Sequence, residues 1–113
     1  MRLKRLIKLL ERLLKKTGTH EGCYITAYNP ESKVTSDQQN ISANKSLYAE
    51  IQKKNAVFYE GIGLDPNSEW EGEPSFLVLG ITFDEAKIIG KKFKQNAIVY
   101  FDRTCIPELI LLK

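Results

Sequence analysis

The stretch SFLVLGITFDEAKIIGKKFKQNAIVYF (residues 75–101) decides the predicted fold. Its apolar beginning, SFLVLGI, is typical of a buried strand, and the capping box TFDE at residues 82–85 marks the start of a helix. That helix has apolar residues on one side and lysines on the other, and NAIVYF at residues 96–101 has the composition of a strand. The stretch therefore predicts a strand, a crossover helix and a second strand.

The same order of elements occurs earlier in the chain. CYITAY at residues 23–28 is rich in strand formers, and Pro30 ends it. The capping box SDQQ at residues 36–39 predicts a helix over residues 37–54, and AVFYEGIG at residues 56–63 predicts the strand after it.

The complete order, β-α-β-β-α-β, predicts an α+β fold with a ferredoxin-like, or split β-α-β, antiparallel sheet. Right-handed crossovers place both helices on one face of that sheet. ELILL at residues 108–112 adds a short C-terminal strand or an apolar tail. A compact three-layer arrangement is the alternative. We expect a single α+β domain over residues 22–113, preceded by a separate helix at residues 1–17.

The N-terminal segment MRLKRLIKLLERLLKK (residues 1–16) predicts an amphipathic basic helix, since its apolar residues recur at helical spacing. It holds seven Lys or Arg and one Glu, whereas the rest of the chain has ten Lys or Arg and thirteen Asp or Glu. Three interpretations are open. The helix covers the domain's own core or a second copy through residues 2–16, lies on a membrane surface, or contacts nucleic-acid phosphates. Because the rest of the chain is mildly acidic, nucleic acid and membrane are the less favoured partners.

Composition excludes several classes of function. No apolar run approaches about 18 residues, and the N-terminus has no signal-peptide pattern, so we expect a cytoplasmic protein. Cys23 and Cys105 lack metal-like or redox spacing and are predicted to be buried thiols. A single histidine, His20, argues against a zinc site and a Ser-His-Asp triad. No metal and no cofactor are predicted, and an enzyme is not the favoured class.

Polar residues gather at one edge of the predicted sheet, where the first two strands end and the next two begin. Amides and hydroxyls suit hydrogen-bonded recognition of a planar group, so we predict a small polar or nucleotide-like ligand there. In this interpretation Asn29 and Asn96 donate and accept hydrogen bonds, Glu73 binds a ribose or an amine, and Trp70 or Tyr28 stacks. The predicted ligand-binding residues are Thr26, Tyr28, Asn29, Asn40, Trp70, Glu73, Ser75, Gln95 and Asn96.

A purely structural interpretation of these residues is equally open. Asn29 before Pro30 can form an Asx-turn, and Asn40 and Asn44 can bond backbone groups at the strand ends. Glu73 is a weak candidate for a general acid or base, which would make the protein a hydrolase or transferase.

Several of these motifs occur together in a known family. ITAYNPES, the Ser36 and Asn40 pair, GIGLDPNSEWEGEPSFLVLGI and FKQNAIVYF resemble a family of small bacterial proteins catalogued as a domain of unknown function (number three-two-nine-three). The resemblance covers about residues 23–112 and implies no established activity. The basic N-terminal helix departs from the family pattern.

Overall fold

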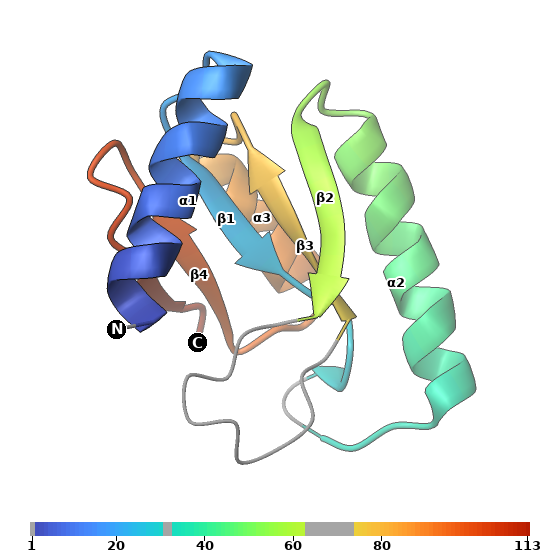
Figure 1. Ribbon diagram of the computed structural model, residues 1–113. Coiled ribbons are helices and arrows are strands. Elements are labelled where there is room, and N and C mark those ends of the chain that lie inside the picture. The colour runs from blue at the N-terminus through green and yellow to red at the C-terminus, as the bar shows by residue number, and fades with distance from the viewer. Residues whose placement is uncertain (1, 31–32, 63–73) are drawn as a thin grey trace.

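The computed structural model describes residues 2–30, 33–62 and 74–113, with the side chains of Arg2 and Ile62 left out (Figure 1). The chain folds as α+β, as predicted. Eight elements follow one another: α1 (Arg2–Thr17), β1 (Gly22–Ile25), α2 (Asp37–Gln52), β2 (Val57–Ile62), β3 (Pro74–Leu79), α3 (Phe83–Lys92), β4 (Ala97–Phe101) and β5 (Glu108–Leu111).

The strands form one antiparallel sheet in the order β2-β3-β1-β4-β5. β1 lies in its middle, with Cys23 opposite Val78 of β3 and Tyr100 of β4. The order β2-β3-β1-β4 agrees with the predicted split β-α-β arrangement. ELILL, which the sequence left open, contributes β5, paired to the outer edge of β4 with Ile110 opposite Ile98.

Helices cover both faces of the sheet. On one face, Leu47 and Ile51 of α2 and Ile89 of α3 pack with Val78 and Ile98 of the strands. On the other face lies α1 (Figure 1), whose side chains pack with strand residues in a second apolar cluster. That cluster consists of Leu10, Leu14, Leu77, Leu79, Phe101 and Cys105, with Leu6, Ile7, Leu13 and Tyr24 at its border.

Both predicted capping boxes begin their helices. The Ser36 hydroxyl accepts a hydrogen bond from the Gln39 N–H at 3.1 Å, and the Gln39 side chain accepts one from the Ser36 N–H. Thr82 and Glu85 form the equivalent pair at α3. These reciprocal bonds satisfy backbone N–H groups that the first helical turn leaves without partners, which is why such short patterns locate helix starts.

The two cysteines are buried free thiols, as predicted. Cys23 lies in the cluster beneath α2 and α3, and Cys105 in the cluster beneath α1, so the sheet separates them. Burial raises the pKa of the Cys23 thiol to about 12, which keeps it protonated and unreactive at neutral pH. None of the helices in the described ranges is long and apolar enough to cross a membrane.

Candidate functional site

Side chains rather than strands bind the backbone just after β1. Thr26 Oγ1 donates a hydrogen bond to the Pro74 carbonyl at 2.7 Å and accepts one from the Tyr28 N–H at 3.1 Å. Asn44 Oδ1 accepts from the Ala27 N–H at 2.9 Å, and Asn44 Nδ2 donates to the same Pro74 carbonyl at 3.2 Å. These bonds take the backbone groups that would continue the sheet. β1 therefore ends at Ile25, three residues before the predicted end at Tyr28.

Asn29, which follows Tyr28, has a left-handed backbone conformation with φ 44°. Its N–H donates to Asn40 Oδ1 at 2.8 Å, and Asn40 Nδ2 donates back to Asn29 Oδ1 at 3.0 Å. The Thr35 N–H also donates to Asn29 Oδ1, at 3.1 Å. Asn40 is 4% exposed, so these bonds compensate for burying its amide.

Gln95 joins the same network from the segment between α3 and β4. Its Nε2 donates to the Tyr28 carbonyl at 3.1 Å and to the Phe93 carbonyl at 3.3 Å. Ser75 is buried beside Pro74 at the start of β3. The Asn96 carbonyl accepts from the Leu112 N–H at 2.7 Å, which extends the pairing of β4 with β5.

The structure thus brings most of the predicted residues to one edge of the sheet. We call the hydrogen-bonded group of Thr26, Tyr28, Asn29, Asn40, Asn44 and Gln95 the amide rim. Asn40 and Asn44 bond backbone groups at the strand ends, as the structural interpretation expected. Two further candidates, Trp70 and Glu73, fall outside the described residues.

A cleft of about 340 Å³ opens beside the amide rim, between α2 and the strands β2 and β3. Only Tyr28 among its lining residues was a predicted ligand-binding residue. Ile41, Lys45 and Tyr48 follow one side of α2 at i, i+4 and i+7. They lie next to the predicted buried line of that helix, which is Asn40, Asn44, Leu47 and Ile51. Their spacing is the signal in the sequence that could have located the cleft. The lining residues are Tyr28, Ile41, Asn44, Lys45, Tyr48, Glu60 and Phe76.

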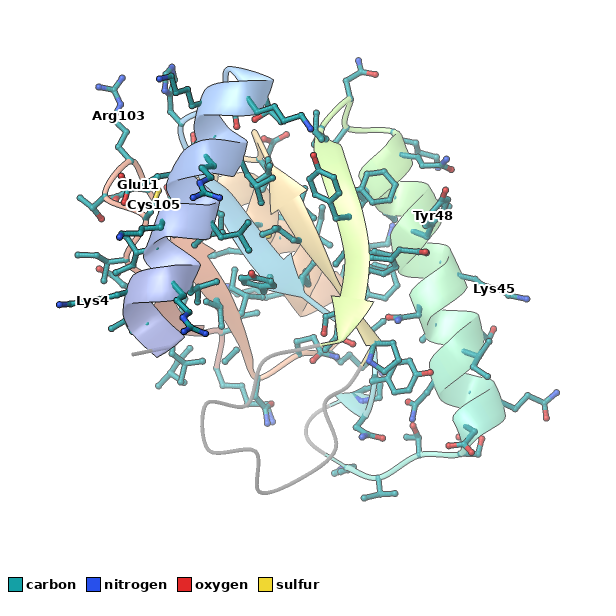
Figure 2. The ribbon with its side chains drawn as sticks, viewed as in Figure 1. Lys4, Glu11, Lys45, Tyr48, Arg103 and Cys105 are labelled. Carbon is teal, nitrogen blue, oxygen red and sulfur yellow. The ribbon has the colours of Figure 1, made fainter. Side chains whose placement is uncertain are left out.

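The cleft combines aromatic rings with one charge of each sign. The Tyr48 ring lies 5.2 Å from that of Phe58 with an interplanar angle of 80°, and 6.1 Å from that of Phe76. Lys45 lies nearly one turn before Tyr48 on α2, and its side chain extends away from β2 (Figure 2). Glu60 lies two residues after Phe58 in β2 and therefore on the same face of that strand, and both Lys45 and Glu60 border the cleft. Neither Lys45 nor Glu60 takes part in an ion pair with another described residue.

A metal centre has no support in the described ranges, where no group of three His, Cys, Asp or Glu side chains comes together. His20 lines a separate hollow of about 510 Å³ between the end of α1 and the turn that joins β4 to β5.

Comparison with known proteins gives a family but no activity. A family model described as "Protein of unknown function (DUF3293)" matches residues 25–98. The search of curated proteins gives no match. One similar solved structure is a phage SAM lyase in complex with S-methyl-5′-thioadenosine, at 15% identity and a TM-score of 0.38, covering 80% of this chain and 87% of that chain. A likeness of this size assigns neither a fold nor a ligand.

Proposed function

The chain belongs to the DUF3293 family of proteins of unknown function, and from its own residues we propose that it binds a small, planar, polar molecule of nucleotide-like character. The proposed site is the cleft between α2 and the strands β2 and β3. The observation that carries the proposal is the meeting of aromatic rings, an amide and two opposite charges in that one cleft.

The size and walls of the cleft suit such a molecule. Its volume of about 340 Å³ lies at the lower end of the roughly 300–1,000 Å³ typical of small-molecule sites. The rings of Tyr28, Tyr48 and Phe76 supply the apolar surface on which a flat ring stacks. Tyr48 is held edge-on by Phe58, so its ring is positioned before any ligand arrives.

The charged and polar groups of the cleft supply orientation. Lys45 suits a phosphate or carboxylate on the ligand, and Glu60 suits hydroxyl or amino groups. A molecule with a flat ring, hydroxyls and an anionic group satisfies all of these features together. A nucleoside monophosphate is the simplest compound of that description.

The amide rim supports this site by fixing Tyr28. The Tyr28 N–H is held by Thr26 and its carbonyl by Gln95, so the backbone that presents the ring is bonded on both sides. Such preorganisation lowers the entropy cost of binding. Asn29, Asn40 and Gln95 therefore position Tyr28 in this proposal. The predicted roles of Trp70 and Glu73 as stacking and ribose-binding residues remain predictions.

The test is thermal unfolding and isothermal titration of the purified chain with nucleosides and nucleoside monophosphates. Glucose 6-phosphate serves as a non-aromatic anion. A ligand at about 100 times its Kd adds about 2.7 kcal/mol to stability, a shift of several degrees in Tm for a domain of this size. We expect a saturable shift with a nucleotide and none with the sugar phosphate.

Variants locate the binding. Tyr28→Ala and Lys45→Ala should weaken nucleotide binding about tenfold each. Tyr59→Ala and Lys91→Ala are matched controls, because Tyr59 lies opposite Leu77 on the α1 face of the sheet and Lys91 is an exposed residue of α3. Binding that is lost equally in the controls, or no binding by any aromatic compound, would contradict the proposal.

A further inference from the structure

α1 is fixed to the sheet by one side only. Leu10 is fully buried and Leu14 is 6% exposed, both packed with Leu79 and Phe101. The opposite side of the helix faces away from the sheet (Figure 1). The packing of Leu10 and Leu14 therefore fixes which side of α1 faces outward.

The outer side is formed by cations. At about 100° per residue, all the described basic side chains of α1 fall within an arc of about 120°. Four of them form a row at i, i+4 spacing: Lys4, Lys8, Arg12 and Lys16. Successive residues of this row are about 6 Å apart along the helix axis, and the whole row is about 18 Å long. Leu9, 48% exposed, borders this row. The cationic face of α1 consists of Lys4, Arg5, Lys8, Arg12, Lys15 and Lys16.

These charges are not neutralised within the described part of the chain. The ion pairs found there join Lys54 to Glu85, Lys87 to Asp84 and Lys92 to Glu50, and none involves α1. Like charges at i, i+4 spacing repel one another and destabilise a helix, so this row of cations lowers the stability of α1.

The one carboxylate of α1 does not interrupt the row. Glu11 lies on the side next to Arg103 and Cys105, in the hollow beside the turn from β4 to β5 (Figure 2). Lys15 of the cationic face lines the same hollow, and Arg103 adds a basic side chain beyond α1.

The mildly acidic remainder of the chain made nucleic acid a less favoured partner at the level of sequence, but the fold buries the apolar side of α1 and leaves its basic side facing outward. We propose that the cationic face of α1 binds the phosphate backbone of nucleic acid without reading its sequence. A polyanion with regular charges complements a row of cations that carries no intervening carboxylate. Protein–protein interfaces are depleted of lysine in their centres, whereas protein–nucleic acid interfaces are strongly positive. An anionic membrane is the weaker fit, since insertion needs the apolar side of the helix, and that side is buried in the protein's own core.

This proposal is independent of the cleft beside the amide rim, which lies with α2 on the other face of the sheet. It gives a role to a segment that the ligand-binding proposal does not use. Either proposal can fail while the other stands.

The test measures fluorescence anisotropy of labelled 20-nucleotide DNA and RNA, single- and double-stranded, with the full chain at several KCl concentrations. We expect saturable binding by all four, with a Kd of roughly 10⁻⁴ to 10⁻⁶ M at about 0.15 M salt, and log K falling linearly with log salt. The triple variant Lys4→Gln, Lys8→Gln, Arg12→Gln should bind at least tenfold more weakly and lower the salt slope by about three.

The matched control removes the same charge elsewhere. Lys33→Gln, Lys53→Gln and Lys91→Gln change exposed lysines outside α1, and this triple variant should retain affinity within about twofold. Circular dichroism verifies both variants; the α1 variant should be at least as helical as the parent chain, because like charges have been removed.

Equal losses in the two triple variants would overturn the proposal, since they would show a general charge effect. So would binding to vesicles with 30% phosphatidylserine, or to polyglutamate, without binding to nucleic acid. An absence of saturable binding at 50 mM KCl would also overturn it.

Discussion

Asn40 and Asn29 hold each other by two hydrogen bonds of opposite direction. Asn40 Oδ1 accepts from the Asn29 N–H at 2.8 Å, and Asn40 Nδ2 donates to Asn29 Oδ1 at 3.0 Å. The pair joins the first turns of α2 to the backbone after β1, at a residue whose φ is 44°. Asparagine suits both demands, because it tolerates the left-handed conformation and carries an amide.

Replacing Asn29 separates these two demands. Asn29→Gly keeps the left-handed backbone and removes Oδ1, which leaves the buried Asn40 Nδ2 without this acceptor, at a cost of about 1–3 kcal/mol. Asn29→Ala adds the left-handed penalty of about 1–2 kcal/mol. We expect the alanine variant to be less stable than the glycine variant by at least about 1 kcal/mol in urea unfolding. Equal stabilities would show that the backbone conformation is not constrained at this position.

The parts of the fold that depend on neighbouring residues were predicted from the sequence. Each capping box, at Ser36 and at Thr82, involves residues only three positions apart, and each marks the start of its helix. The apolar stripe of α1 likewise identifies the side of the helix that packs on the sheet. The end of β1 was predicted three residues too late. Thr26, Ala27 and Tyr28 are compatible with a strand, and it is the distant side chain of Asn44 that takes the Ala27 N–H.

The candidate site was predicted only in part for the same reason. The convergence of strand ends places Thr26, Asn29 and Gln95 together, and that follows from topology. The cleft depends on how α2 crosses the sheet, because Lys45 and Glu60 come from elements that meet only in the folded chain. The local pattern of residues along the chain does not determine the angle and position at which α2 crosses the sheet.

Two glycines in the same sheet, Gly22 in β1 and Gly61 in β2, should respond differently to the same substitution. A Cβ at Gly22 would lie 2.5 Å from the Val78 carbonyl oxygen and 2.6 Å from Phe101 Cζ, so the sheet backbone must move. Overpacking of this kind costs about 1–3 kcal/mol, and we expect Gly22→Ala to fall in the upper half of that range in urea unfolding.

Gly61→Ala is the matched control. A Cβ added at Gly61 would have no described atom within 4 Å. Gly61 belongs to the edge strand β2 and pairs regularly with Ser75 of β3. Alanine there restricts the unfolded chain and should be neutral or stabilising by up to about 1 kcal/mol. A Gly22→Ala protein as stable as the Gly61→Ala protein would contradict the close approach of β1 to β3.

The acid side of the stability profile should depend on Glu85. Its carboxylate accepts hydrogen bonds from the Thr82 N–H at 3.1 Å and the Thr82 hydroxyl at 3.0 Å, and Lys54 Nζ lies 3.8 Å away. These contacts lower the pKa of Glu85 below its usual 4.5, with the Thr82 bonds the largest cause. Because the folded pKa lies below the unfolded one, the stabilisation is complete above the unfolded pKa and is lost as pH falls through the folded pKa.

Glu85→Gln should therefore lower Tm at pH 7, and the difference from the parent chain should shrink as pH falls from about 5 to about 3. Glu108→Gln is the control, because it removes an exposed carboxylate from the edge strand β5 without touching a helix cap. Thermal unfolding at half-unit pH intervals measures both. A difference between Glu85→Gln and the parent that stays constant over this range would show that the cap contributes through hydrogen bonding alone, and that the charge of the carboxylate adds nothing.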